Sequence, residues 1–240
     1  RCVKLSVIIP AHNEEGHVVE TVRGVVNALR AERIPFEIVV VNDGSMDRTC
    51  EVVKTESTTN PEIRLIHAHP SGGLGRALRS GFASAKGDAI AVVMADASDA
   101  PEDLVRYYRV LAEGYDCVFG SRFRSGSRLT RYPPMKLVLN RILNRTLQLA
   151  FMTPFNYLTN AFKIYRRTAL LDIAPLRANH FDITLELSLK SVAHGFKIAE
   201  IPIAWRGREF GVTKLHLSRA ASHYLKTAFR IWSTTHLARH

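Results

Sequence analysis

The sequence contains few cysteines and no long apolar run, and each absence excludes a class of protein. Its three cysteines, Cys2, Cys50 and Cys117, match neither a disulfide framework nor a metal-binding spacing, so we expect a reducing, cytoplasmic setting. No apolar run approaches the ~20 residues that cross a bilayer, and no signal-peptide pattern is present. We therefore expect no membrane-spanning segment, although these features are compatible with a protein that lies on a membrane surface.

Acidic residues are scarce in the second half of the chain. Residues 1–120 hold 13 Lys and Arg against 17 Asp and Glu, a net charge of −4, whereas residues 121–240 hold 20 against 5, a net charge of +15. This asymmetry indicates that the second half meets an anionic partner: phosphate groups, a membrane surface or nucleic acid. The alternative is that the basic residues only keep the chain soluble. We expect no nucleic-acid partner, because the sequence has no recognised nucleic-acid-binding motif and no interleaved aromatic platform.

Short apolar runs alternate with segments of helical spacing in the first half. Because such alternation builds β-α-β units, it predicts an α/β fold with a parallel sheet buried on both faces. Ligands of such sheets bind beyond the carboxyl ends of the strands. The predicted strands are "KLSVIIP", which ends at Pro10, "FEIVVV", which is stopped by Asn42-Asp43-Gly44, "IRLIHAH" and "DAIAVVMAD", and the predicted helices cover residues 16–30, 47–54 and 72–87.

Three polar clusters follow three of these strands. They cover residues 10–14, 42–45 and 96–99. Because the carboxyl ends of parallel strands meet at one edge of a sheet, the clusters indicate one site rather than three independent turns. By itself Asp43 is weak evidence, since Asn-Asp-Gly is common in turns for steric reasons. The "GGLG" segment is equally weak evidence for dinucleotide binding, because it follows the third strand rather than the first.

The segment "VVMADASDAPED" ends a buried strand at two carboxylates, Asp96 and Asp99. Carboxylates at a strand end suit Mg²⁺ or Mn²⁺, hard ions that prefer oxygen ligands. Alternatively, Asp99 or Ser98 caps a helix that begins near Pro101. Capping does not account for Asp96, which stands at the last position of the strand. We therefore favour the metal, with Asp99 able to cap the helix as well.

The second half is less regular. Residues 121–150 hold seven Lys and Arg and no acid, and Arg122, Arg131 and Lys136 are placed to meet phosphate oxygens. Residues 135–152 predict an amphipathic helix, "FKIAEIPIAW" predicts one strand, and a second amphipathic helix begins at Ser218. Aromatic side chains opposite a basic row on that last helix suit either a membrane surface or packing on the protein's own core.

Seven segments in order resemble family 2 glycosyltransferases with the GT-A fold, most closely the dolichol- and polyprenol-phosphate mannose synthase branch. They are "SVIIPAHNEE", "VVVNDGSMDRT", "GGLGRALRSGF", "VFGSRF", "NAFKIYRR", "IAEIPIAW" and "REFGVTK", and they span roughly residues 4–216. The resemblance implies one GT-A domain over residues 1–240, a Rossmann-like, mostly parallel sheet flanked by helices. Residues 1–120 would bind the nucleotide sugar, residues 121–216 the acceptor, and residues 217–240 would form the C-terminal amphipathic helix.

The resemblance also implies an inverting transfer from a nucleotide-diphosphate sugar, of the GDP-mannose or UDP-glucose type, with a divalent metal bridging the diphosphate. The donor nucleotide would be held by Pro10, Asn13, Glu14, Asp43 and Ser45, with Arg208 and Lys214 closing over the diphosphate on a mobile loop. The acceptor phosphate would be held by Arg122, Arg131, Lys136 and Asn140. The metal would be held by Asp96 and Asp99, which with Arg122 form the catalytic set.

The chain departs from the family pattern at several of these positions. Ser98 stands where the second Asp of the metal motif is usual, with Asp99 one place further on. Asn42 replaces the first Asp of the turn, and Lys136 and Asn140 stand where Arg and Ser are usual. His12 and Asn156 also differ from the residues common there. These differences bear on the donor and the acceptor more than on the reaction class.

The resemblance suggests a peripheral enzyme on the cytoplasmic face of a membrane, acting on a polyprenyl-phosphate-type acceptor. A phosphate monoester is anionic at neutral pH and needs no general base. A hydroxyl acceptor, the first alternative, would need one, and Asp182 or Glu186 could serve. The second alternative is a module that binds a nucleotide sugar or nucleic acid without catalysis.

Overall fold

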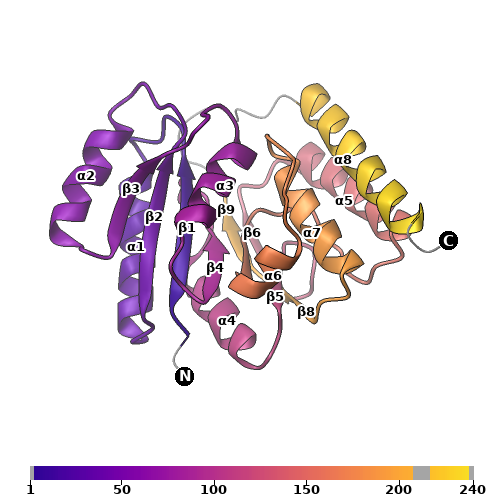
Figure 1. Cartoon of the computed structure of the whole chain (residues 1–240), viewed down its shortest axis with the longest axis horizontal. Helices are drawn as coiled ribbons and strands as arrows, with labels where there is room; N and C mark the ends of the chain where they lie inside the picture. Colours follow the sequence, from indigo (N-terminus) through magenta and orange to yellow (C-terminus); the bar gives the residue numbers. More distant parts are fainter. Residues whose placement is uncertain (1–2, 208–216, 238–240) are drawn as a thin grey trace.

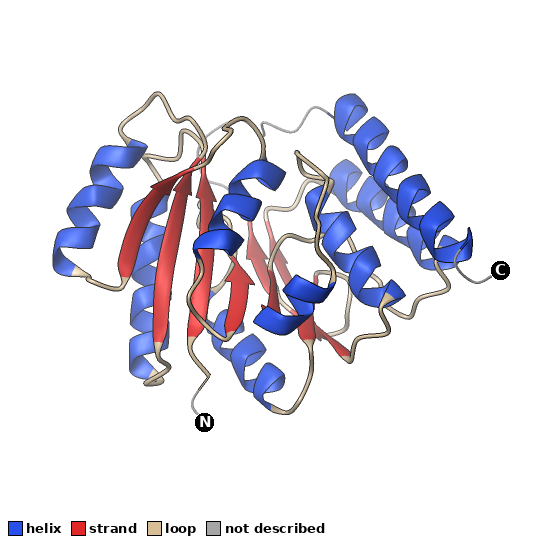
Figure 2. Ribbon diagram, in the orientation of Figure 1, coloured by secondary structure: helices blue, strands red, loops and turns tan. Residues whose placement is uncertain are grey.

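The computed structural model describes residues 3–207 and 217–237, in which seven strands form one sheet of order β3-β2-β1-β4-β7-β5-β8. All neighbours in this sheet are parallel except β7, which runs antiparallel to β4 and β5. The arrowheads of β1, β2 and β3 lie along one edge in Figure 2. The strands are β1 (Leu5–Ala11), β2 (Phe36–Asn42), β3 (Ile63–His67), β4 (Ala89–Val92), β5 (Cys117–Ser121), β7 (Lys163–Arg166) and β8 (Ile198–Pro202).

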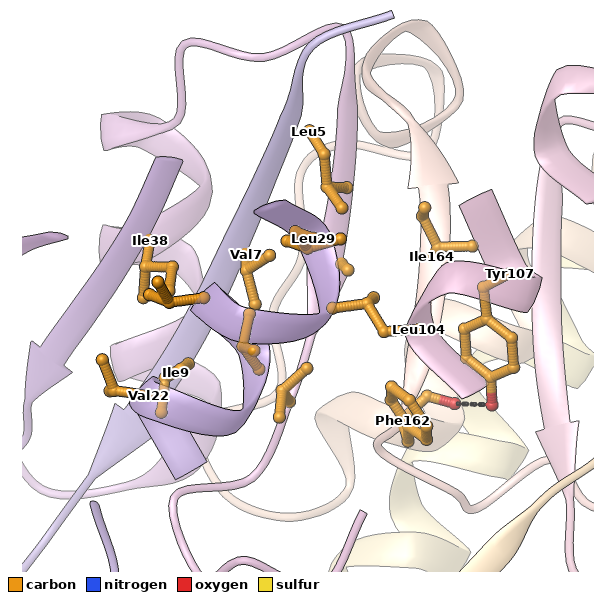
Figure 3. Packing of buried hydrophobic residues seen from close by; sticks show 14 of the residues in the cluster. Leu5, Val7, Ile9, Val22, Leu29, Ile38, Leu104, Tyr107, Phe162 and Ile164 are labelled. Atoms are coloured by element: carbon orange, nitrogen blue, oxygen red, sulfur yellow. Dashed lines mark hydrogen bonds between the residues drawn. The ribbon is translucent and has the colours of Figure 1, made fainter. Parts of the chain in front are cut away.

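One face of the sheet is covered by α1 (Val18–Ala31) and α4 (Pro101–Ala112), while α2 (Thr49–Thr59) packs beside α1. Val18, Val22 and Leu29 of α1 recur at helical spacing and are buried against the sheet. Figure 3 shows Val22 and Leu29 against β1 and β2, with Leu104 and Tyr107 of α4 further along the same layer. Each such side chain contributes roughly 1.5–3 kcal/mol through its removal from water.

The opposite face is covered by α3 (Leu74–Ser84), α6 (Arg167–Asp172) and α7 (Ile183–Ala193). Gly81 of α3 lies directly over β1, and a Cβ atom added there would stand 2.3 Å from Cγ2 of Ile8. Only glycine therefore lets this helix approach the sheet so closely. Because both faces are covered, β1 and β2 are almost entirely buried, as their continuous β-branched runs predict.

A third apolar cluster joins α5 (Pro134–Ala150), α7 and α8 (Leu217–Leu237). It contains Leu147 of α5, Leu185 and Leu189 of α7, and Tyr224 and Ile231 of α8. Figure 1 shows α5, α7 and α8 together at one end of the molecule. Among the described residues, every helix is too short or too polar to cross a bilayer.

The α/β fold with a mostly parallel sheet, and the C-terminal helix, are as predicted, but one predicted strand is wrong. The segment "FKIAEIPIAW" forms two strands, β8 and β9 (Ala204–Arg206), rather than one. Strand β9 leaves the main sheet and pairs with β6 (Arg128–Thr130) in a separate two-stranded sheet. Strand β6 was not predicted, because three residues are too few for a strand pattern and two of them are exposed.

Candidate active site

The loops after β1 and β2 are tied together at the carboxyl edge of the sheet. Ala11 and Asn42, the last residues of these strands, are register partners. Beyond them, the backbone N–H of Asn13 donates to Oγ of Ser45 at 3.0 Å, and Oδ1 of Asn13 accepts the N–H of Met46 at 2.8 Å. Two of the predicted polar clusters therefore form one structure, as their positions after parallel strands indicated.

Asp43 joins this edge to the glycine-rich start of α3. Its carboxylate is buried and accepts the backbone N–H groups of Gly72 at 2.6 Å and Gly73 at 2.8 Å. Nδ1 of His12 lies 2.7 Å from the carbonyl oxygen of Asp43. The "GGLG" segment thus serves as a close-packed turn held by a carboxylate.

The other predicted donor residues lie at the same edge, where the structure describes them. Pro10 is buried in β1, and Glu14 is buried with its backbone N–H donating to Oγ1 of Thr49 at 2.9 Å. Arg208 and Lys214 lie outside the described residues. The nucleotide-binding roles of this group stay predictions.

The third cluster, residues 96–99, is a tight turn after β4. Asp96 is half-buried, and its Oδ1 accepts the Ser98 hydroxyl at 2.6 Å and the Ser98 N–H at 3.2 Å. Ala97 between them has a positive φ of 54° and donates its N–H to Oγ1 of Thr21. Ser98, which stands where the family has an Asp, therefore orients the Asp96 carboxylate.

Asp99 does not cap α4. The N-cap residue is Ala100, and no side chain caps this helix end. Instead Asp99 is buried, with Oδ2 3.3 Å from the N–H of Met94 and Oδ1 without a hydrogen-bond partner. Burial raises the pKa of the Asp99 carboxyl to about 7; Arg122 opposes this shift and Asp96 adds to it. The capping explanation is therefore wrong.

This donor set fits a hard divalent cation in part. Among the side chains that the structure describes, at residues 3–207 and 221–234, no three His, Cys, Asp or Glu gather as metal ligands. The turn offers the half-buried Asp96 carboxylate, the Ser98 hydroxyl, and the unpartnered Oδ1 of Asp99. Oxygen donors of this kind suit Mg²⁺ or Mn²⁺ that keeps several positions for water and substrate phosphates.

The predicted acceptor residues gather around one tyrosine. The Lys136 ammonium lies 6.0 Å and the Arg122 guanidinium 5.7 Å from the centre of the Tyr132 ring. Nδ2 of Asn140 donates to the Tyr132 hydroxyl at 2.5 Å. The structure therefore brings together Arg122, Lys136 and Asn140, while Arg131 is an exposed residue with a positive φ of 55° beside them in the chain.

Asn42 and Asn156, which differ from the residues common in the family, both form hydrogen bonds with neighbouring side chains or backbone. Oδ1 of Asn42 accepts the N–H of Ser45 at 3.0 Å, and the Ser121 hydroxyl donates to the side chain of Asn156. Asn42 therefore shapes the turn that carries Asp43. Asn156 fixes the end of β5, next to Arg122.

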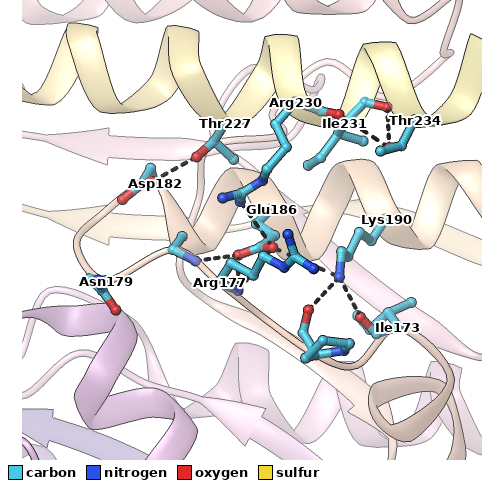
Figure 4. Close-up of polar contacts among 12 residues, drawn as sticks. Ile173, Arg177, Asn179, Asp182, Glu186, Lys190, Thr227, Arg230, Ile231 and Thr234 are labelled. Carbon is cyan, nitrogen blue, oxygen red and sulfur yellow. Dashed lines mark hydrogen bonds and ion pairs between the residues drawn. The ribbon is translucent and has the colours of Figure 1, made fainter.

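The two carboxylates considered as general bases are not placed for catalysis. Glu186 is fully buried in α7, where it accepts the N–H groups of Arg177 and Ala178 and pairs with Arg230 of α8 at 3.1 Å. Asp182 accepts the Thr227 hydroxyl at 2.7 Å. Figure 4 shows both carboxylates between α7, α8 and the preceding loop. The base hypothesis is wrong, because these groups hold α8 in place.

Three aromatic residues of the site went unrecognised in the sequence. Tyr132, Tyr157 and Trp205 all lie with their rings toward the Arg122 guanidinium. They come from three separate segments, and an isolated aromatic residue in a sequence is most often a core residue. No periodic signal could have brought them together.

Comparisons with known proteins bear on the family and the fold of the chain. The sequence model of the family described as "Glycosyl transferase family 2" matches residues 6–173. The polyprenol monophosphomannose synthase of Mycolicibacterium smegmatis is 29% identical over 228 residues, which are 92% of this chain and 84% of the relative. The dolichol-phosphate mannosyltransferase of Pyrococcus furiosus is 28% identical over 95% of this chain, which spans 64% of that protein's length.

Solved structures share the fold at low identity. The glucosyl-3-phosphoglycerate synthase of Mycobacterium tuberculosis, in complex with Mn²⁺, uridine diphosphate and phosphoglyceric acid, superposes with a TM-score of 0.74 at 18% identity. The match covers 96% of this chain and 78% of that one. The same enzyme with Mg²⁺ and uridine diphosphate gives a TM-score of 0.72 at 19% identity, over 96% of this chain and 80% of that one.

Proposed function

The chain belongs to glycosyltransferase family 2, and from this premise we propose that it moves a hexose from a nucleotide-diphosphate sugar to a polyprenyl-phosphate-type lipid. The curated relatives named for polyprenol- and dolichol-phosphate mannose transfer support this acceptor. The observation that carries the proposal is the group of Arg122, Lys136 and Asn140 around Tyr132, beside the carboxylates of Asp96 and Asp99.

The proposed reaction is a displacement at the anomeric carbon. An oxygen of the acceptor phosphate attacks that carbon, the bond to the donor diphosphate oxygen breaks, and the electron pair leaves with the nucleoside diphosphate. Because a phosphate monoester is largely dianionic at neutral pH, no proton needs to be removed. The positions of Asp182 and Glu186, locked between α7 and α8, favour this acceptor over a hydroxyl that would need a base.

The electrostatic problem in this reaction is to bring together two phosphate-bearing partners. Arg122 and Lys136 would neutralise the acceptor phosphate, and Arg can do so through two parallel hydrogen bonds. Asp96, with Ser98 and Asp99 beside it, would hold Mg²⁺ or Mn²⁺. When bound, the cation stabilises negative charge on the leaving diphosphate. In this proposal residues 1–120 form the donor half and residues 121–216 the acceptor half.

The donor half would recognise the nucleotide of a GDP-mannose- or UDP-glucose-type donor. The fused loops after β1 and β2 form the wall of the proposed pocket. The N–H groups of Gly72 and Gly73 fix the orientation of the Asp43 carboxylate. The carboxylate keeps free lone pairs, which can accept a hydrogen bond from the nucleobase of the donor. Arg208 and Lys214, which lie outside the described residues, are proposed to bind the donor diphosphate.

We infer that helices α5 and α8 rest on the cytoplasmic surface of a membrane. Neither helix contains an acidic residue. Both expose apolar side chains at helical spacing: Met135, Val138, Leu139, Ile142 and Leu149 on α5, and Leu225, Phe229 and Trp232 on α8. Apolar stripes on basic, acid-free helices suit a surface that contains anionic lipid.

The membrane proposal predicts binding to vesicles. The protein should sediment with phosphatidylglycerol vesicles and less with neutral phosphatidylcholine vesicles. The double variant Ile142→Glu, Phe229→Glu should lose most of this binding, because it puts a charge in each stripe. The matched control is Leu171→Glu on α6, where Leu171 is 65% exposed, close to the 59% of Ile142 and the 70% of Phe229. Equal loss in the control would overturn the proposed surface.

The function itself is tested by transfer to a short lipid phosphate. Purified protein with Mn²⁺ is given GDP-mannose or UDP-glucose together with farnesyl phosphate or farnesol. We expect a glycosyl phosphate product with one donor, from farnesyl phosphate alone, and only with metal. Product from farnesol would support the hydroxyl-acceptor alternative. Metal-independent nucleotide binding without any product would favour the non-catalytic alternative.

A further inference from the structure

Three aromatic rings surround the guanidinium group of Arg122. Its central carbon lies 4.5 Å from the ring centre of Trp205, 5.5 Å from that of Tyr157 and 5.7 Å from that of Tyr132. The rings of Tyr132 and Trp205 also contact each other edge to face, with centres 4.8 Å apart. Arg122 follows β5, Tyr132 precedes α5, Tyr157 lies after α5, and Trp205 lies in β9. Four separate segments therefore meet at one cation.

The hydrogen-bonding edge of this cation is incomplete. Nε of Arg122 is buried and has no hydrogen-bond partner. Among the described residues the Arg122 guanidinium has no ion pair, although Asp99 is near enough to act on it electrostatically. The rings stabilise the face of the guanidinium, and the Tyr132 side chain hydrogen-bonds it as well, but Nε keeps no acceptor. A buried N–H donor without a partner points to an anionic ligand in the plane of the guanidinium.

Trp205 also connects this cation to the proposed metal turn. It forms an isolated antiparallel bridge with Asp99, and the next residue, Arg206, donates its N–H to the carbonyl oxygen of Ser98 at 3.1 Å. One residue further along the chain, Gly207 donates its backbone N–H to the carbonyl oxygen of Thr130 in β6 at 2.9 Å. The backbone around Trp205 therefore joins the turn at residues 96–99 to the strand that precedes Tyr132.

We propose that Trp205 is a positioning residue that holds the Arg122 guanidinium in the plane needed to bind the acceptor phosphate. The ring restricts rotation of the guanidinium, and the backbone bonds place the ring at a fixed distance from Asp99. The inference rests on the proposed function, because it assigns Arg122 to the acceptor phosphate. It extends that function by naming the group that sets the preference for a phosphate over an alcohol.

Two substitutions at residue 205 distinguish the effect of an aromatic ring from the effect of side-chain volume. Trp205→Leu removes the aromatic face, and Trp205→Phe keeps it. We expect Trp205→Leu to raise the acceptor KM for farnesyl phosphate by roughly 10- to 30-fold, the loss of one desolvated cation–ring contact, with the donor KM unchanged. Trp205→Phe should stay within about 3-fold of the parent. Equal increases in both KM values, or no rescue by Phe, would overturn the positioning role.

The matched control is Tyr115→Leu. Tyr115 is half-buried like Trp205, and Lys197 lies over its ring at the same 4.5 Å, but it precedes β5 at the opposite edge of the sheet. This variant should leave both KM values as they are. A similar rise in the acceptor KM would show that losing any cation–ring pair disturbs the enzyme, and would overturn the specific role of Trp205.

A binding experiment needs no turnover. The chain has two tryptophans, Trp205 and Trp232, so Trp232→Phe leaves Trp205 as the only tryptophan emitter. Titration with farnesyl phosphate should change its emission saturably, and farnesol should not. Adding Arg122→Ala should abolish the change. An equal response to farnesol, or one that survives without Arg122, would overturn the inference.

The sugar-transfer assay and the fluorescence titration distinguish failure of the proposed function from failure of the role assigned to Trp205. If the parent transfers sugar to farnesyl phosphate but Trp205→Leu keeps the parent's acceptor KM, the inference is wrong and the proposed function stands. If no donor supports transfer but the fluorescence response requires both the phosphate and Arg122, the proposed function is wrong and the phosphate site stands. Circular dichroism on each variant identifies a loss of fold, and in that case Trp205→Phe and the parent titration decide.

Discussion

Replacement of Asp96 by Ala should lower the rate of sugar transfer by at least roughly 10²–10³-fold, the usual cost of losing one preorganised electrostatic group at a reacting centre. Asp96 is the half-buried carboxylate of the turn after β4, and the Ser98 hydroxyl orients it at 2.6 Å. Without it, the turn keeps only the Ser98 hydroxyl and the buried Asp99 for a cation. Donor titration by calorimetry with and without Mn²⁺ should show that the metal-dependent part of nucleotide binding is lost.

The control for this variant is Asp172→Ala, which removes an exposed carboxylate at the end of α6. It should leave transfer and nucleotide binding unchanged. Both proteins should unfold at temperatures close to that of the parent, because neither carboxylate belongs to the apolar core. An Asp96→Ala enzyme with the parent rate would remove the proposed metal site and with it the central part of the mechanism.

Replacement of Glu186 by Ala should destabilise the protein by roughly 3–5 kcal/mol, the cost of breaking a buried ion pair. The Glu186 carboxylate is 0% exposed, and it pairs with Arg230 at 3.1 Å and accepts the N–H of Ala178 at 2.6 Å. Its loss leaves a partly buried guanidinium and buried N–H groups without acceptors (Figure 4). At about 2–4 °C per kcal/mol for a domain of this size, Tm should fall by roughly 6–20 °C.

Two variants make this result specific. Glu51→Ala breaks an exposed pair with Arg48, in which the side chains are 63% and 71% exposed, and should change Tm little. Arg230→Met removes the cation of the pair and leaves the carboxylate its two backbone donors, so it should cost less than Glu186→Ala. If Glu186→Ala melts at the parent temperature, α8 is not held by this carboxylate.

The donor edge was predictable because it depends on local order along the chain. Runs of Val and Ile form parallel strands, and the residues after such strands reach one edge whatever the details of packing. Asn13 and Ser45 meet there, as their positions indicated. Even the binding role expected of Asp43 is compatible with its observed bonds to Gly72 and Gly73, which no spacing rule anticipates.

The roles of the carboxylates could not be predicted in the same way. Glu186 and Asp182 stand in sequence near a plausible site, yet they face α8, which lies more than 30 residues further along the chain. Asp99 could have capped α4 as well as faced a metal, and the backbone turned its Oδ2 inward to the N–H of Met94, away from the helix end. The sequence does not specify which way a carboxylate points, and its neighbours in the folded chain determine what it binds.

The fold class, the polar edge of the sheet and the family can all be predicted from the residues in order, because they follow from alternation and from short segments of adjacent residues. The separation of β8 from β9, which brings Trp205 to both Asp99 and Arg122, is visible only in the folded chain. The difference lies in distance along the chain. Four segments between residues 122 and 205 converge on one guanidinium, and contacts of that separation arise from packing rather than from local conformational preference.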